Sequence, residues 1–157
     1  MAKKIKNILS LDQGNVTGFA CKTDSRVTFG HRDFNAYIDI PARWFSFHGW
    51  FSDLLSETKP DLVTYEQPFF RGKNSLALYG YVVHLETICF IYDTKCKKVN
   101  GSAIKKHAGV APNEKPVAQA EKKWGHIQPV QNDHEADALW LMDYTAVHYQ
   151  YKDKEDV

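Results

Sequence analysis

The chain has 157 residues, 43% hydrophobic and 13% aromatic, which is enough for one domain with a sizeable core and no metal or disulfide staples. Its 20 basic and 19 acidic side chains leave a net charge of +1, which by itself argues neither for nor against a nucleic-acid partner. The apolar run after the lysine-rich N-terminus is too short for a signal peptide or a membrane span, which excludes membrane-embedded function classes. Three cysteines without CxxC spacing, Cys21, Cys89 and Cys96, indicate reduced thiols in a cytoplasmic protein.

The first expected element is a buried strand over residues 8–12 that ends on Asp12. Gly14 and Gly18 follow within six residues, and an apolar run resumes at 19–21, a pattern typical of a hairpin. A carboxylate that faces the interior at the end of such a strand needs a hydrogen-bonded partner or a cation. The alternative is an ordinary turn aspartate, since Asx turns are common where glycine follows.

A third antiparallel strand is expected over residues 26–34, where Val27 and Phe29 alternate with polar side chains. Pro41 then opens a helix that ends at Lys59-Pro60. One stripe of this helix carries Trp44, Phe47, His48, Phe51, Leu54 and Leu55. The stripe predicts core packing, and His48 is interpreted as a packed histidine rather than a ligand.

A short buried strand over residues 61–66 again ends on a carboxylate, Glu66. Because this strand follows a helix after a three-strand meander, a crossover connection should place it parallel to the first strand. Asp12 and Glu66 would then lie at the same end of neighbouring strands. The alternative is that Glu66 is a turn residue before Gln67-Pro68.

A loop with two aromatic and two cationic side chains follows, which suits stacking on bases and contact with phosphates. Its members are Phe69, Phe70, Arg71 and Lys73, and at least one phenylalanine is expected to fold back onto the core. The helix from Leu76 to about Tyr92 is apolar over much of its circumference. Such a helix is either central in the fold or shared with a second subunit, and Gly80 would allow a close approach.

A last strand is expected over 96–99, followed by helices over 103–108 and 113–124. Residues 95–123 carry eight lysines and two glutamates. This charge is consistent with phosphate binding or with an ordinary solvated surface.

The final helix, from residue 132, begins with a polar first turn. His134 and Asp137 project from one face at spacing i, i+3, and Asp133 and Asp137 share a similar face at i, i+4. Asn132 with Glu135 forms a predicted capping box, and the helix dipole favours Asp133 as well. Neither effect explains Asp137, which lies a full turn into the helix beside the apolar stripe.

Asp12, Glu66, His134 and Asp137 form a mixed set of oxygen and nitrogen ligands. Hard oxygen ligands favour Mg²⁺ or Mn²⁺, and one imidazole is compatible with Mn²⁺ in particular. Two such ions about 4 Å apart can hydrolyse a phosphodiester. Zinc is disfavoured for this set, because no cysteine or second histidine falls at ligand spacing.

Three segments, 11–18, 65–74 and 134–139, resemble in order the active-site motifs of the RuvC Holliday-junction resolvases and their phage-encoded relatives. The resemblance implies an α/β, ribonuclease H-like fold with a mixed five-stranded sheet, three antiparallel strands then parallel strands, flanked by helices. It implies one nuclease domain over residues 1–151 with a charged tail over 152–157. It also implies a homodimer that cuts four-way DNA junctions with two Mg²⁺ or Mn²⁺ ions per active site, in the cytoplasm of a bacterial or phage-infected cell.

The resemblance assigns roles to single residues. Asp12 would bridge both metal ions, Glu66 would bind one of them and Asp137 the other. His134 stands where many family members have aspartate, so whether His134 or Asp133 completes the metal site is left open.

The resemblance also implies contacts with DNA and with a second subunit. Phe69 or Phe70 would be a wedge that stacks at the junction, and the helix beginning near Leu76 would form the dimer interface. Residues similar to the family's basic residues that hold the scissile phosphate are Lys105, Lys106 and Lys115.

The same motifs allow three other functions. The motif at Asp12 also opens the phosphate loop of actin-like and sugar-kinase ATPases, but those enzymes need a second domain and a second glycine-rich motif that this chain does not have. A nearer alternative is a ribonuclease H-like nuclease that acts on forks, flaps or structured RNA, because loops and dimer geometry set the substrate. A catalytically silent junction-binding protein is disfavoured by the complete set of candidate ligands.

Overall fold

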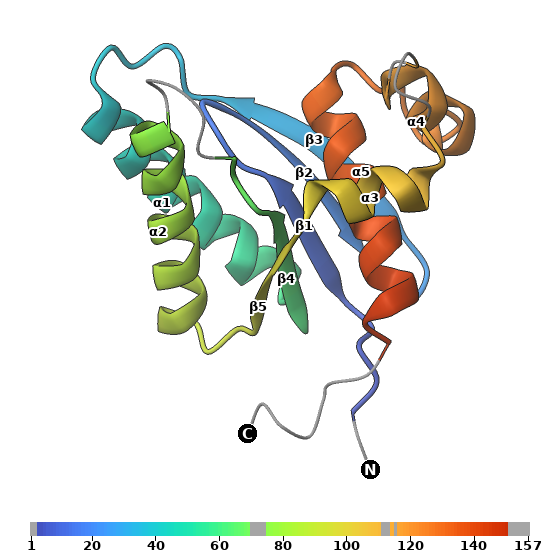
Figure 1. Cartoon of the computed structure of the whole chain (residues 1–157). Coiled ribbons are helices and arrows are strands. Elements are labelled where there is room, and N and C mark those ends of the chain that lie inside the picture. Colours follow the sequence, from blue (N-terminus) through green and yellow to red (C-terminus); the bar gives the residue numbers. More distant parts are fainter. Residues whose placement is uncertain (1–2, 70–74, 111–113, 115, 151–157) are drawn as a thin grey trace.

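The computed structural model describes residues 3–69, 75–110, 114 and 116–150. Five strands form one mixed sheet in the order β3-β2-β1-β4-β5 (Figure 1). The first three strands pair antiparallel, β4 is parallel to β1, and β5 is parallel to β4. The strands are β1 Ile8–Asp12, β2 Val16–Lys22, β3 Val27–Asp33, β4 Leu62–Glu66 and β5 Cys96–Val99. The predicted α/β fold, with three antiparallel strands followed by parallel ones, is confirmed.

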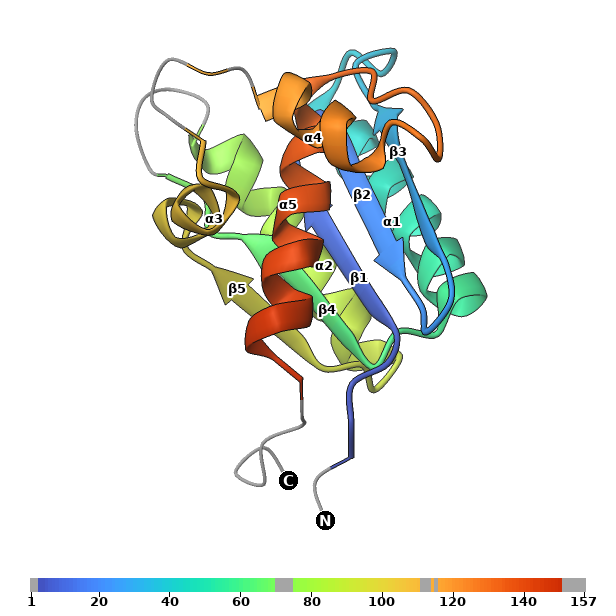
Figure 2. The same cartoon turned by 90° about the vertical axis from the view of Figure 1, so that its right-hand side faces the viewer.

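Helices cover both faces of the sheet, so the domain has three layers. They are α1 Ile40–Thr58, α2 Ser75–Ile91, α3 Gly101–Ala108, α4 Pro116–Trp124 and α5 Asp133–His148. Figures 1 and 2 show α1 and α2 on one face of the sheet and α3, α4 and α5 on the other. Within the described ranges, no helix combines the length and the apolar character that crossing a membrane requires.

The side chains of β1 alternate between two hydrophobic cores, as the pleat of a strand requires. Leu9 and Leu11 lie in the core under α1 and α2, whereas Ile8 lies in the core under α4 and α5. Ser10, on the same side as Ile8, hydrogen-bonds Thr64 of β4 at 2.7 Å, and Thr64 contacts the hydroxyl of Thr145 in α5 at 2.9 Å. The same alternation directs the last residues of β1 and β4, which are both acidic, toward α5.

The layer of α1 and α2 is packed mainly by aromatic rings. The Trp44 indole donates to the backbone oxygen of Ala77 at 3.1 Å and occupies the space that a side chain at Gly80 would need, since a Cβ there would lie 2.1 Å from the indole. Gly80 therefore allows the close approach that the sequence indicated, and the approaching group is Trp44. Lys59 takes a left-handed conformation with φ 43° at the end of α1, just before Pro60.

Two local predictions were wrong. The helix expected over residues 113–124 begins only at Pro116, with Glu114 in a bend, because proline lacks an N–H and is suited to the first helical position. Gly18 was assigned to the turn of the first hairpin but lies within β2, paired with Asp12. The charged tail over residues 152–157 lies outside the described residues, as do 111–113 and 115.

Candidate metal centre

Three carboxylates converge where β1, β4 and α5 meet. Asp12 and Glu66 end their strands, and the parallel pairing of Leu11 with Tyr65 brings the two strand ends side by side. Asp137 approaches from the second turn of α5, and one oxygen of each of the three carboxylates lies within 4.8 Å of the others. The structure therefore brings together the three acidic residues that the sequence singled out on two strands and a helix.

The first turn of α5 lies directly on β2, opposite Asp12. Gly18 is the partner of Asp12 in the strand register, and a Cβ at Gly18 would lie 1.9 Å from the backbone oxygen of His134. Only glycine permits this contact without moving the helix. The later glycine of the first motif thus serves to position the helix that carries His134 and Asp137.

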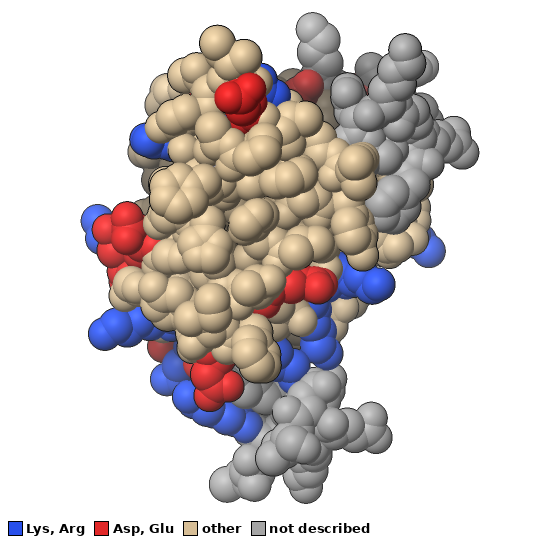
Figure 3. All heavy atoms as spheres, turned by 90° about the vertical axis from the view of Figure 1, so that its left-hand side faces the viewer, with Lys and Arg blue, Asp and Glu red and all other residues tan. Residues whose placement is uncertain are grey.

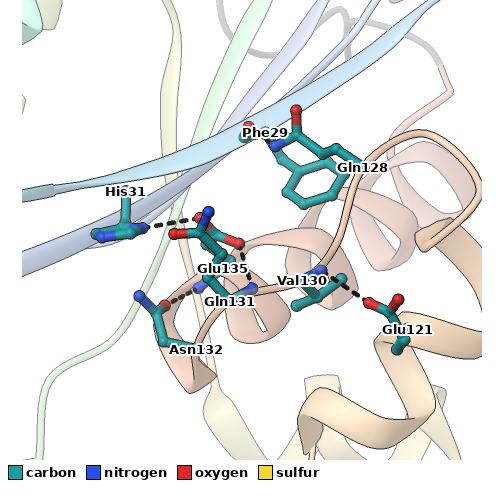
Figure 4. A network of polar contacts seen from close by, with 8 residues as sticks. All are labelled: Phe29, His31, Glu121, Gln128, Val130, Gln131, Asn132 and Glu135. Atoms are coloured by element: carbon teal, nitrogen blue, oxygen red, sulfur yellow. Dashed lines mark hydrogen bonds and ion pairs between the residues drawn. The ribbon is translucent and has the colours of Figure 1, made fainter.

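Glu135 anchors the same turn to β3 (Figure 4). The residue is 2% exposed; Oε1 lies 2.8 Å from His31 Nδ1, and Oε2 accepts from the backbone N–H of Gln131 at 2.8 Å. Asn132 caps α5 by accepting from the Glu135 N–H at 3.0 Å. The capping box is therefore only half formed, because the Glu135 carboxylate bonds Gln131 and His31 instead of closing back on Asn132.

The segment that leads into α5 is fixed from both sides by further hydrogen bonds, also drawn in Figure 4. The Gln128 amide donates to the backbone oxygen of Phe29 in β3 at 2.7 Å. The Val130 N–H donates to Glu121 of α4 at 2.7 Å. Together with the Glu135 contacts, these bonds fix the start of α5 relative to the sheet edge.

The three converging carboxylates are electrostatically strained. Burial raises the pKa of Asp137 to about 7, and the charges of Asp12 and Glu66 add to the effect. Burial also raises the pKa of Glu66, as does the charge of Asp12, while Lys105 of α3 opposes this rise. Negative charges so close together favour a bound cation, and carboxylate oxygens are the ligands that Mg²⁺ and Mn²⁺ prefer. Asp12, Glu66 and Asp137 could thus hold a divalent metal ion.

His134 is a direct partner of Asp12. Its Nδ1 lies 2.8 Å from Asp12 Oδ2, and this hydrogen bond raises the pKa of His134, with smaller contributions from the charges of Asp12, Asp137 and Asp133. The protonated imidazole can therefore donate a hydrogen bond to the Asp12 carboxylate and orient it. Asp133 itself is exposed to solvent.

A cleft of about 420 Å³ opens above these groups. It is lined by residues that include Asp12, Gln13, Glu66, Phe69 and His134. Gln13, which the sequence analysis did not single out, donates its amide to the backbone oxygen of Glu66 at 2.9 Å and so ties the ends of β1 and β4 together. Phe69 is 67% exposed, so it is not the phenylalanine expected to fold back onto the core.

The remaining candidate DNA contacts are only partly described. Lys105 and Lys106 are exposed on α3, and Lys105 is the one whose charge reaches Glu66. The other candidates, Phe70, Arg71, Lys73 and Lys115, lie outside the described residues.

No protein-family model matches the sequence, and no curated protein sequence matches it either. Solved structures do match. RuvC from T. thermophilus, in complex with a Holliday junction substrate, has a TM-score of 0.75 at 15% identity, over 94% of this chain and 98% of that chain. The yeast mitochondrial Holliday junction resolvase Ydc2 has a TM-score of 0.67 at 13% identity, over 96% and 84% of the two chains.

A weaker likeness is to YeaZ from Pseudomonas aeruginosa, with a TM-score of 0.54 at 11% identity over 97% of both chains. At identities this low, the structural likeness shows the fold alone, and the activity has to be argued from the site. The two RuvC structures match over 94% and 93% of this chain and over 98% of their own chains. The chain therefore has the same fold as the RuvC structures.

Proposed function

We propose that this chain is a divalent-metal-dependent endonuclease that cleaves branched DNA, with four-way junctions as its main substrate. The observation that carries the proposal is the triad Asp12, Glu66 and Asp137, whose oxygens lie within 4.8 Å of one another on a fold like that of RuvC. Two solved structures of this fold are those of RuvC bound to a Holliday junction substrate and of Ydc2, a Holliday junction resolvase. The triad without this fold, or this fold without the triad, would support only a less specific function than junction cleavage.

In this proposal Asp12, Glu66 and Asp137 would hold two Mg²⁺ or Mn²⁺ ions, with Asp12 as the ligand common to both. Such ions would supply water activation and charge stabilisation for phosphodiester hydrolysis. Asp12 lies beside Glu66 and Asp137 and also contacts His134. His134 orients Asp12 through its hydrogen bond.

The surroundings of the cleft suit a DNA backbone and an unstacked base. Phe69 stands exposed at the edge of the cleft, where its ring can stack on a base at the branch point. Lys105, whose charge opposes the rise in the pKa of Glu66, is the lysine proposed to contact the scissile phosphate. Further candidate DNA contacts in this proposal are Phe70, Arg71, Lys73, Lys106 and Lys115. Binding should weaken steeply with salt, because phosphate contacts release counterions.

A homodimer would let two such sites cut symmetric strands. On α2, the apolar residues Leu76, Tyr79, Val83 and Phe90 are exposed, and their spacing places them on one stripe. Figure 3 views the molecule from the side of α1 and α2 and shows a broad surface in which uncharged side chains predominate. A second copy of the chain is the partner proposed for this surface, because an apolar patch of this kind is unusual on a monomer.

The decisive test is cleavage of a labelled immobile four-way junction beside linear duplex, a Y-fork and an RNA–DNA hybrid, each with Mg²⁺, Mn²⁺ or EDTA. Paired symmetric nicks that require metal would support the proposal. Asp12→Asn should abolish cleavage and keep junction binding, whereas the control Asp24→Asn, at an exposed aspartate near Lys6, should cleave normally. Cleavage confined to forks or RNA would assign another nuclease function to the same site. Tight junction binding without cleavage would indicate a binding protein.

The dimer is tested separately by analytical ultracentrifugation. Phe90→Glu places a charge on the exposed stripe of α2 and should shift the chain toward monomer. Val147→Glu, at an exposed apolar residue of α5 on the opposite helical layer, is the matched control and should leave the mass unchanged. A wild-type chain that sediments as a monomer at micromolar concentration would contradict the proposed interface.

A further inference from the structure

Two histidines meet between α1 and α2, on the side of the sheet away from the carboxylate cleft. His48 and His84 are separated by 36 positions, and their Nδ1 atoms lie 3.3 Å apart. The ring planes are nearly perpendicular, at 87°, with centroids 5.5 Å apart. Both side chains are half-buried. The packing expected of His48 is thus accompanied by a second imidazole that faces it.

The separation of the two nitrogens matches that of two ligands on one metal ion. Imidazole nitrogens bind Zn²⁺ at about 2.0–2.1 Å, so two of them on a tetrahedral ion lie about 3.3–3.4 Å apart. The same distance lies just beyond the usual range of about 2.7–3.2 Å for an N–H···O hydrogen bond. The observed 3.3 Å thus suits two ligands of one ion as well as a long hydrogen bond between the rings.

The surroundings of His48 and His84 favour the binding of a metal ion. Burial lowers the pKa of His84, and the charge of His48 lowers it further, so the neutral form that binds metals is favoured. The Trp44 ring packs against His84 with centroids 6.1 Å apart, and Trp44 is itself fixed by its hydrogen bond to Ala77 and its contact with Gly80. The His84 imidazole is thus held in place by its neighbours before any ion binds.

We propose that His48 and His84 form a binding site for a borderline transition-metal ion such as Zn²⁺, distinct from the carboxylate triad. Imidazole suits Zn²⁺, Ni²⁺ and Cu²⁺, whereas the carboxylates suit Mg²⁺ or Mn²⁺, so the two sites select different ions. Because both rings are half-exposed, solvent fills the remaining coordination positions. An ion held by one ligand from each helix links α1 to α2 and stabilises the folded state by mass action. The site does not depend on the proposed nuclease activity.

The test titrates ZnCl₂ into the full chain carrying Asp12→Asn and Asp137→Asn, which disables the carboxylate triad as a competing site. Isothermal titration calorimetry should detect one Zn²⁺ per chain. Adding His48→Asn or His84→Asn should weaken binding at least about tenfold, since losing even a group that only orients a ligand costs 10- to 100-fold. The exposed His126, changed to Asn, is the matched control and should leave the affinity unchanged.

Two further readouts cover the case in which a histidine variant folds poorly. Cu²⁺ bound to the chain with both histidines intact should show hyperfine coupling to two nitrogens by electron paramagnetic resonance. Zn²⁺ should raise the unfolding temperature of this chain and leave that of the folded histidine variants unchanged. Absence of binding to the chain with both histidines, or binding that persists when both are replaced, would overturn the proposal and leave a hydrogen-bonded pair.

Discussion

Two carboxylates at the start of α5 sit in opposite environments although only one residue separates them. Glu135 is buried, and both of its oxygens have hydrogen-bond partners. Asp137 lies beside Asp12 and Glu66, and its pKa is raised to about 7. A buried carboxylate with satisfied oxygens stabilises a fold, whereas one crowded by other carboxylates indicates a site that a cation neutralises.

Helical geometry explains how one turn serves both purposes. A step of two residues rotates a side chain by about 200° around the helix axis, so Glu135 and Asp137 point to opposite sides of α5. Glu135 reaches His31 of β3, near one edge of the sheet, while Asp137 reaches the ends of β1 and β4. The structural residue anchors the helix on one side so that the candidate ligand is presented on the other.

Among the acidic residues at the start of α5, the largest expected effect is that of Asp137→Asn on cleavage. Removing this carboxylate should lower the rate of junction cleavage by about three orders of magnitude, comparable to the loss of a group that stabilises transition-state charge directly. The metal-free protein should be at least as stable as wild type at pH 8, because the substitution removes repulsion with Asp12 and Glu66. Cleavage assays with Mg²⁺ and thermal unfolding in EDTA measure the two effects. A variant that cleaves normally would remove Asp137 from the site.

Glu135→Leu should show the reverse pattern. It leaves the Gln131 N–H and the His31 ring without their partner, and breaking a buried polar pair of this kind costs about 3 kcal/mol of unfolding free energy. Urea denaturation measures the loss. The folded fraction should keep junction cleavage within about tenfold of wild type, since the triad itself is intact. Glu135→Gln, which keeps the shape and one acceptor, is the control and should destabilise less. Equal stability of the leucine variant would show that the anchor contributes nothing.

The sequence predicted the residues of the candidate metal site well. Two short apolar runs that each end on an acid, joined through a helix, predicted parallel strands with Asp12 and Glu66 at one edge, and the strand pairing confirms this arrangement. Local spacing placed His134 and Asp137 on one face of a helix at that edge. These inferences need only strand periodicity, crossover connectivity and helical spacing, all of which are local or topological.

The contacts that anchor α5 could not be predicted, because they join segments that are distant in the sequence. Local rules assigned Glu135 to a capping box, while its actual partner His31 is 104 residues away. The same holds for His48, whose partner His84 comes from another helix. Gly18 signalled a turn, yet its role is to let the His134 backbone approach, which only the packed structure reveals.

The third prediction concerns pH. Because the pKa of Asp137 is about 7, a metal ion must displace a proton below that pH, and the apparent affinity for Mn²⁺ should fall about tenfold per pH unit from 7 toward 5. Calorimetry in buffers of different ionisation enthalpy would detect this proton release. A flat affinity between pH 5.5 and 8 would contradict the environment assigned to Asp137.

The raised pKa of Asp137 has the opposite effect on the stability of the metal-free fold, measured in EDTA. A carboxyl that binds its proton more tightly when folded contributes stability that is full below its unfolded pKa of about 4 and is lost as the pH rises through about 7. Acidification from pH 8 to 6 should therefore weaken Mn²⁺ binding while this group stabilises the metal-free fold. Asp137→Asn should remove that share of the pH dependence.

The smallest expected effect is that of Asp133→Asn, which changes another acidic residue at the start of α5. Asp133 is exposed and acts on His134 and Asp137 only through its charge. An exposed charge is screened by solvent, so we expect junction cleavage within about threefold of wild type, corresponding to less than 1 kcal/mol. Kinetics at low and moderate salt measure the effect, which should shrink as salt rises. A loss of cleavage as large as that of Asp137→Asn would mean that Asp133 itself binds metal. Burial beside Asp12 and Glu66 would then not be what distinguishes a metal ligand on α5.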